Sequence, residues 1–325
     1  MSPPNPPTQT RWGLTLPFAG VGLAESEQLI RQAEAEGYDD LWTGDTSGPD
    51  GFTPLALSAA WTERMRLGTG IVNVFTRGPA VLAQHAAALA DASSGRFVLG
   101  LGASSNVIVE RWNGITFEHP VSKVRETVAA LRPVLEGGRG PGGFRLETAP
   151  AAPVPIYLAA LRERMLALAG EVADGVFVNF LPLSGVARVL SHVHDGERQS
   201  GRPEGSIDVV CRFFCVPQSA EEGIGVARYL FAAYATVPVY EAFFRWLGWG
   251  ERLDPMVAAW KAGDRQQALE LCPDELVREI VIFGSAAEQR ERLDEFAAAG
   301  IRTLVLTPMA APPGDLAGLV SGLAR

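Results

Sequence analysis

Short apolar runs alternate with amphipathic segments along almost the whole chain. The runs predict eight strands, at Trp12–Leu16, Asp39–Thr43, Arg66–Val72, Phe97–Gly102, Pro155–Ala159, Gly175–Asn179, Ile207–Val216 and Thr303–Thr307. The segments between them predict helices over Glu25–Glu36, Pro79–Ala92, Val121–Leu135, Glu163–Val172, Ser184–Gln199 and Ala286–Ala299. Repeated strand–helix units put the strands parallel, with right-handed crossovers. Eight such units favour a closed (β/α)8 TIM barrel over an open sheet.

The length of 325 residues fits one such barrel, which we expect over residues 11–325. Residues 1–10, MSPPNPPTQT, are proline-rich and are expected to form a disordered tail. Residues 219–285 are too long for one crossover and predict a helical insertion between the seventh and eighth strands. The insertion is rich in aromatic residues, among them Phe243 and Trp246. They could form a lid that contacts substrate, an oligomer interface or a local core.

The composition excludes several classes of protein. Hydrophobic residues make up 47% of the chain and charged residues 20%, so the chain can bury a large core. A net charge of −9 argues against a general nucleic-acid binder. No apolar run is long enough to span a membrane and no signal peptide is visible, so we expect a cytoplasmic protein.

No metal site is expected from the cysteine and histidine residues. Cys211 and Cys215 are spaced CxxxC on one predicted strand and are interpreted as two buried apolar thiols. His192 and His194 are two residues apart on a predicted helix, so they do not share one face. A small-molecule substrate and a homodimer are the expected partners.

The most informative stretch is Leu67–Ser105, LGTGIVNVFTRGPAVLAQHAAALADASSGRFVLGLGASS. It predicts a glycine-rich strand, a polar turn, a helix, and a second strand that ends in Gly-Leu-Gly. Glycine at a strand end lets a ligand approach the backbone, because no Cβ stands in the way. Glycines at strand ends are common in barrels, so the residue chemistry alone is a weak signal.

As an ordered whole, the stretch resembles the luciferase-like family, and in particular the branch that uses the deazaflavin coenzyme F420. The resemblance includes four further segments in the expected order, at Leu41–Asp45, Ala103–Pro120, Pro155–Asn179 and Phe283–Leu306. It extends over nearly the entire chain.

The resemblance implies a cofactor site at the strand ends. A non-proline cis peptide, here Gly70–Ile71, would press against the middle ring of the cofactor. Asp45, with Thr46 beside it, is the expected catalytic group near the ring, and capping of a turn is the structural alternative for Asp45. Asn73 would offer an amide, and Gly102, Ala103, Ser104 and Ser105 would contact the polar tail.

The loop after the fifth strand departs from the family pattern. Gly-Pro-Lys-Met is expected there, and the chain has Arg162-Glu163-Arg164-Met165. Two guanidinium groups would suit the phosphodiester and glutamates of F420, whereas solvated charges on the first turn of a helix are the alternative. The resemblance also assigns cofactor contacts to Ala160, Met165 and Asn179.

Two more departures concern the substrate. F420-dependent glucose-6-phosphate dehydrogenases have histidine where this chain has Thr46, and glutamate where it has Ser105. Oxidation of a sugar is therefore not expected. Residues near the predicted mouth that could contact substrate are Phe75, Arg111, Trp112, His119, Phe243 and Trp246.

Three functions remain open at this point. The first is an F420H2-dependent reductase that transfers hydride to an activated C=C, C=N or C=O of a small or natural-product substrate. The second is an FMN-dependent monooxygenase that uses reduced flavin and O2. The third is a non-catalytic member of the family, either a binder of the cofactor or another ligand, or the inactive partner of a catalytic subunit.

Overall fold

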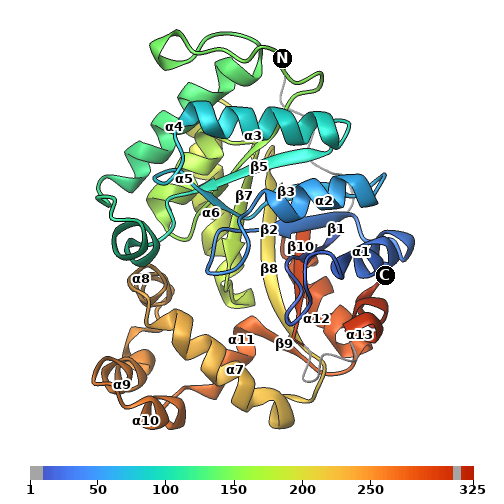
Figure 1. The fold of residues 1–325 in the computed structure, drawn as a ribbon. Helices are drawn as coiled ribbons and strands as arrows, with labels where there is room; N and C mark the ends of the chain where they lie inside the picture. The colour runs from blue at the N-terminus through green and yellow to red at the C-terminus, as the bar shows by residue number, and fades with distance from the viewer. Residues whose placement is uncertain (1–9, 310–315) are drawn as a thin grey trace.

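Eight parallel strands close into a barrel in a computed structural model that describes residues 10–309 and 316–325 (Figure 1). The predicted tail therefore lies almost entirely outside the described residues. The barrel strands are β1 (Arg11–Thr15), β2 (Asp40–Thr43), β3 (Arg66–Thr69), β5 (Phe97–Gly102), β6 (Ile156–Ala159), β7 (Gly175–Asn179), β8 (Asp208–Val216) and β10 (Thr303–Pro308). Pairing of β8 with β10 closes the ring, which confirms the predicted (β/α)8 barrel.

The third barrel position differs from the prediction of one uninterrupted strand. After β3 the backbone leaves the ladder at Gly70 and Ile71, and β4 (Val72–Asn73) then pairs with β5. A short strand that was not predicted, β9 (Val281–Phe283), pairs with the end of β8 outside the ring. Both features lie at the carboxyl ends of the strands.

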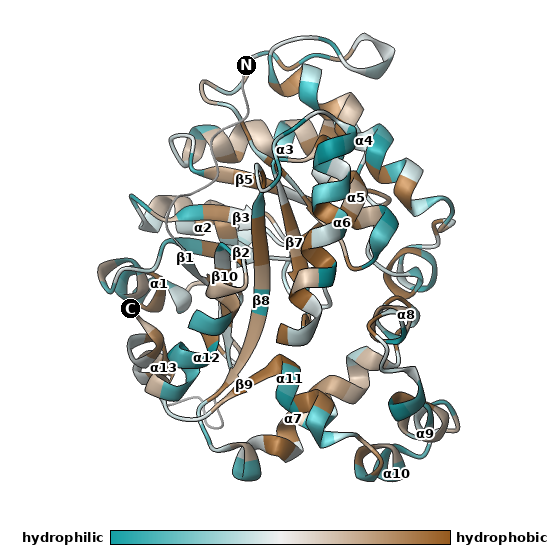
Figure 2. Cartoon of the chain, turned by 180° about the vertical axis from the view of Figure 1, so that it is seen from behind, coloured by the Kyte–Doolittle hydropathy of each residue, from teal (hydrophilic) through white to brown (hydrophobic). Residues whose placement is uncertain are grey.

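Helices cover the outside of the barrel. They are α1 (Ser26–Ala35), α2 (Thr53–Trp61), α3 (Pro79–Ala92), α4 (Pro120–Leu135), α5 (Glu163–Val172), α6 (Val186–Gln199), α12 (Ala286–Ala298) and α13 (Leu316–Leu323). Single-turn helices lie at Val107–Trp112, Pro141–Gly143 and Leu183–Gly185. The strands are mostly hydrophobic whereas the helices carry both kinds of residue (Figure 2), as expected for strands that are buried on both faces. No helix of the described ranges is both long and apolar enough to cross a membrane.

Five helices follow β8 and lie to one side of the barrel, at the end where β8 finishes (Figure 1). They are α7 (Ala220–Ala235), α8 (Pro238–Trp246), α9 (Gly250–Lys261), α10 (Arg265–Glu270) and α11 (Asp274–Ile280). Their aromatic residues form a local core, in which Phe231, Phe243 and Phe244 are fully buried. The ring of Trp246 packs on α6, 4.2 Å from the guanidinium carbon of Arg188. The expectation that Phe243 contacts substrate is therefore wrong for this structure, because no part of that side chain is exposed.

Glycines on several strands make room for large side chains inside the barrel. A Cβ on Gly70 would lie 2.6 Å from the ring of Phe177, and one on Gly175 would lie 2.6 Å from the ring of Tyr157. A Cβ on Gly68 would overlap the Trp42 ring. The interior cluster formed in this space consists of Trp42, Val98, Tyr157, Phe177, Val210 and Val305. It separates the two ends of the barrel.

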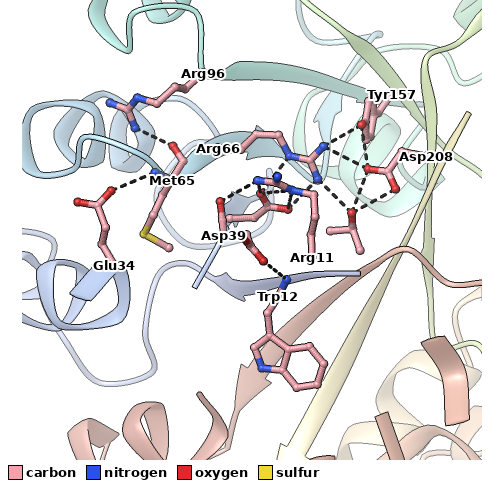
Figure 3. Close-up of polar contacts among 11 residues, drawn as sticks. Arg11, Trp12, Glu34, Asp39, Met65, Arg66, Arg96, Tyr157 and Asp208 are labelled. Atoms are coloured by element: carbon pink, nitrogen blue, oxygen red, sulfur yellow. Dashed lines mark hydrogen bonds and ion pairs between the residues drawn. The ribbon is translucent and has the colours of Figure 1, made fainter. Parts of the chain in front are cut away.

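A buried polar network occupies the amino-terminal end of the barrel. Arg66 donates to both Asp40 (2.7 Å) and Asp208 (3.2 Å), and the Tyr157 hydroxyl donates to Asp208 at 2.9 Å (Figure 3). Arg11 makes a second ion pair with Asp40. Burial alone would raise the pKa of Asp40, but the Arg66 and Arg11 guanidiniums outweigh it and hold that pKa below its ordinary value. This end is filled by paired charges.

Replacing Arg66 with methionine should destabilise the protein by about 3 kcal/mol, because two buried carboxylates would lose a shared partner. The measurement is urea unfolding at neutral pH. Arg31→Met is the matched control, since Arg31 makes an exposed i,i+4 pair with Glu27 that should contribute less than about 1 kcal/mol.

Acid provides a second readout of the same network. A carboxylate whose pKa is lower in the folded than in the unfolded protein stabilises the fold. This stabilisation is complete above the pKa of the unfolded state, about 4, and is lost as the pH falls through the pKa of the folded state. The difference in the free energy of unfolding between wild type and Arg66→Met should therefore become smaller below about pH 4. If Arg66→Met destabilised the protein no more than Arg31→Met at neutral pH, the role of Arg66 as the shared partner of two buried carboxylates would be contradicted.

Candidate functional site

The carboxyl ends of the eight strands form the mouth of the barrel, opposite the Arg66 network. Polar side chains gather at these ends, because parallel strands all finish at the same face. They include Thr15 at the end of β1, Asp45 after β2, Asn73 on β4, Ser104 after β5, Asn179 on β7, Arg212 on β8 and Thr307 on β10. The structure thus places most of the predicted cofactor residues at one face.

The backbone of Gly70 and Ile71 is enclosed by neighbours that have no side chain. The peptide bond between them is cis. A Cβ on Gly44 would lie 2.9 Å from the Gly70 carbonyl oxygen, and one on Gly100 would overlap the Thr69 carbonyl. The Asp45 N–H donates to the Ile71 carbonyl at 2.9 Å. The half-exposed Ile71 side chain packs against the interior cluster, so it forms part of the floor of the mouth.

Asp45 is fully engaged by groups of the protein. Its carboxylate accepts the backbone N–H groups of Gly51 (3.0 Å) and Asn73 (3.2 Å). It also pairs with both terminal nitrogens of Arg77. These contacts favour the structural alternative, in which Asp45 holds the turn and the Ile71–Asn73 backbone. Thr46 is exposed, and within the described part of the chain its hydroxyl accepts only the Gly48 N–H, at 3.4 Å.

Asn73 is buried beside the Gly70–Ile71 peptide and has one unused donor. Its Oδ1 accepts the Phe75 N–H at 2.8 Å. Its Nδ2 is buried and has no hydrogen-bond partner among the described residues. Burying an amide donor without a partner costs about 1–3 kcal/mol, so an acceptor from a ligand would remove that penalty.

The backbone after β5 offers further donors. Ser104 has a φ of 64°, a left-handed conformation that non-glycine residues seldom adopt. Within the described residues, the N–H groups of Ser104 and Ser105 donate to no other group of the protein. Gly102 precedes them, and a Cβ there would lie 2.7 Å from the Ile71 side chain and 3.2 Å from that of Ala159. Ala103, Ser104 and Ser105 are all half-buried, which leaves them accessible to a ligand.

The loop after β6 presents two exposed guanidiniums. Arg162 is the residue that precedes α5, and Arg164 lies in its first turn. Neither forms an ion pair with a carboxylate of the described ranges. Ala160 is buried and Met165 is half-buried. The two cations therefore remain available to an anion.

A polar chain that was not predicted from the sequence links β7, β8 and the insertion. Arg212 donates through Nε to the Asn179 Oδ1 at 3.1 Å, and the Asn179 Nδ2 donates to the Tyr240 hydroxyl oxygen at 2.9 Å. Burial raises the pKa of Tyr240. The sequence signal was present, because Arg212 is a charged residue at an inward position in the middle of β8, with apolar residues on both sides of it in DVVCRFFCV.

The remaining predicted substrate residues lie apart from this chain. Phe75 packs on Phe117, with ring centroids 5.1 Å apart. Arg111 and Trp112 end the helical turn Val107–Trp112, and Trp112 is 56% exposed. His119 is exposed and has a positive φ where it precedes α4. Trp246 packs on α6, so it does not join the polar groups of the mouth.

The other sequence features have simpler explanations. Cys211 and Cys215 are buried free thiols, as predicted, and burial raises the pKa of both. Across residues 10–309 and 316–325, no group of three or more metal-binding side chains is close enough to hold an ion.

Known proteins resemble this chain over most of its length. A 29% identical relative, the Mycobacterium tuberculosis protein named "Putative coenzyme F420-dependent oxidoreductase", aligns with 95% of the chain and 98% of its own length. The structure of coenzyme F420-dependent tetrahydromethanopterin reductase from Methanopyrus kandleri has a TM-score of 0.80 at 22% identity, and 98% of each chain is covered. The oxygenating component of 3,6-diketocamphane monooxygenase from Pseudomonas putida, in complex with FMN, has a TM-score of 0.69 at 16% identity, with 97% of each chain covered.

The family model for luciferase-like monooxygenases matches residues 7–303, which include every barrel strand except most of β10. The chain belongs to the luciferase-like monooxygenase family.

Proposed function

We propose that the protein is an F420H2-dependent reductase that delivers hydride to an activated C=C, C=N or C=O bond of a small molecule. The observation that carries the proposal is the enclosed Gly70–Ile71 backbone at the mouth, with the unpartnered Asn73 amide beside it. The F420-dependent name of the 29% identical relative supports the choice of cofactor.

The residues at the mouth fit a flat ring with a polar, anionic tail. Ile71 would contact the ring, and the Asn73 Nδ2 would donate to a polar atom at its edge. The hydroxyls and free N–H groups of Ser104 and Ser105 would bind the tail, and Arg162 would pair with its phosphodiester. When bound, reduced F420 supplies a hydride.

The chain's own groups would position the reactants. Asp45 acts as a positioning residue, because it ties the Ile71 carbonyl and the Asn73 N–H to the loop after β2. The Tyr240 hydroxyl accepts a hydrogen bond from Asn179 and keeps its own proton for an acceptor at the mouth. Its raised pKa keeps the phenol protonated at neutral pH.

An FMN-dependent monooxygenase is the second candidate, because the FMN-bound fold of the diketocamphane enzyme is similar. Arg162 and Arg164, which form no ion pair with another described residue, favour F420, because F420 has both a phosphodiester and a glutamate tail whereas FMN has a single phosphate. A non-catalytic binder would be indicated if neither cofactor were bound.

Titration of the purified protein with F420 and with FMN tests the cofactor. We expect micromolar binding of F420 by fluorescence quenching, a higher melting temperature at saturation, and at least tenfold weaker binding of FMN. Tighter binding of FMN would contradict the proposal and favour the monooxygenase. Binding of neither would favour the non-catalytic alternative.

Asp45→Asn should weaken F420 binding about tenfold, because loss of the charged contacts with Arg77 and Asn73 costs on the order of 1.5–3 kcal/mol in positioning. Asp50→Asn is the control, since Asp50 caps Phe52 and Thr53 in the same loop without touching the Gly70–Ile71 backbone. Equal affinities of the two variants would show that Asp45 has no special role.

Arg162→Ala should also raise the F420 dissociation constant, by roughly ten- to a hundredfold at low salt, and the effect should shrink at high salt. Arg139→Ala serves as the control because Arg139 lies in the loop after α4, at the opposite end of the barrel. Unchanged affinity at low salt would identify Arg162 as a solvated charge at the start of α5.

A further inference from the structure

Arg212 is a cation inside the barrel mouth that has no opposite charge among the residues that the structure describes. Its side chain is half-buried, and its guanidinium lies 5.0 Å from the Phe214 ring centroid. No carboxylate of the described residues forms an ion pair with it. By contrast, the two arginines at the other end of the barrel, Arg11 and Arg66, both pair with Asp40. A partly buried charge without a partner is costly, so a bound anion would stabilise it.

The guanidinium is held in one orientation with its outer edge free. Nε is the only guanidinium nitrogen of Arg212 that donates to another described residue, and its acceptor is the Asn179 Oδ1. Asn179 is in turn fixed by its bond to Tyr240. The two terminal nitrogens therefore remain available, in the planar fork that matches a carboxylate.

The position of Arg212 is suited to substrate rather than to cofactor. The ring order is β1, β2, β3 with β4, β5, β6, β7, β8 and β10, so β8 lies across the barrel from Gly70 and Ile71. Asn179 follows Phe177 by two residues on β7, and the Phe177 ring lies against Gly70. Asn179 and Arg212 thus lie one inward position above the floor that Ile71 and Phe177 form. A ring that rests on Ile71 would have Arg212 across the mouth from it.

We propose that Arg212, oriented by Asn179 and joined by the Tyr240 hydroxyl, binds a carboxylate of the substrate. The inference rests on the proposed function and adds a substrate class, conjugated or otherwise activated carboxylic acids. Two guanidinium N–H groups and the phenol O–H are donors of the kind that a carboxylate accepts. Tyr240 comes from the insertion, so the insertion contributes a group to the site.

The test uses crotonate and crotonamide, a matched pair that differs in charge but hardly in size. Binding of each to the purified protein is measured by ligand-observed NMR, with and without F420. The wild-type protein should bind crotonate at least tenfold more tightly than crotonamide, as expected for a charge-assisted pair. Arg212→Gln should abolish the preference while its melting temperature and its F420 affinity stay near wild type.

Two further variants separate binding from packing. Arg212→Lys keeps the charge but loses the fork, so it should retain only part of the preference. Tyr240→Phe should reduce it about threefold or more, because one donor is lost. Arg188→Gln is the control, since Arg188 is an exposed arginine on α6 that stacks on Trp246.

Equal binding of the two probes by wild type, or an unchanged preference in Arg212→Gln, would overturn the assignment of Arg212. The measurement without F420 distinguishes this failure from failure of the proposed function. A carboxylate preference in a protein that does not bind F420 would support the Arg212 site and contradict the choice of cofactor.

Discussion

The position of the Gly70–Ile71 backbone depends on the absence of side chains around it. Gly44 on one side and Gly100 on the other leave room for the carbonyls of Gly70 and Thr69, and Gly70 itself leaves room for the Phe177 ring. A Cβ at any of these positions would meet the backbone or an aromatic ring. Because glycine has no Cβ, the third barrel strand can leave its ladder here. Ile71, Asn73 and the Asp45 loop all take their positions from that departure.

The two ends of the barrel solve the problem of buried charge differently. At the amino-terminal end, Arg11 and Arg66 form ion pairs with Asp40, and Arg66 also pairs with Asp208. The interior cluster closes the barrel above these pairs. At the mouth, the one comparable pair is Arg77 with Asp45, whereas Arg212 has no opposite charge within the part of the chain that the structure describes. Paired charges stabilise a fold, and an oriented charge without a partner is available for binding.

The fold could be predicted from the sequence because the signal is repeated eight times. Alternation of apolar runs and amphipathic segments determines strand number, direction and crossover hand, so errors in single elements did not alter the architecture. The division of the third strand and the additional strand β9 were missed, since both are settled by contacts with neighbouring strands. The packing of the insertion into a local core was not decided from the sequence for the same reason. A run of aromatic residues does not show which surface those residues pack against.

The candidate site could be predicted only in part. The family resemblance indicated Asp45, Asn73 and Ser104 at the strand ends, but whether Asp45 is free or engaged depends on Arg77, which is 32 residues away in sequence. Tyr240 and Asn179 are 61 residues apart in sequence, and no local sequence pattern predicts their contact. Arg212 was visible as a charge between apolar residues in the middle of β8, and strand periodicity would have placed it inside the barrel.

We propose that a deazaflavin binds with its ring against Ile71, at the mouth that Arg212 faces from the opposite wall. A crystal structure of the protein with F420 measures this directly. We expect electron density for the ring in contact with Ile71, the Asn73 Nδ2 within hydrogen-bond distance of the cofactor, and the Arg212 guanidinium free of the cofactor. Density for the ring away from Ile71, or for the cofactor's anionic tail on Arg212, would contradict this mode of binding.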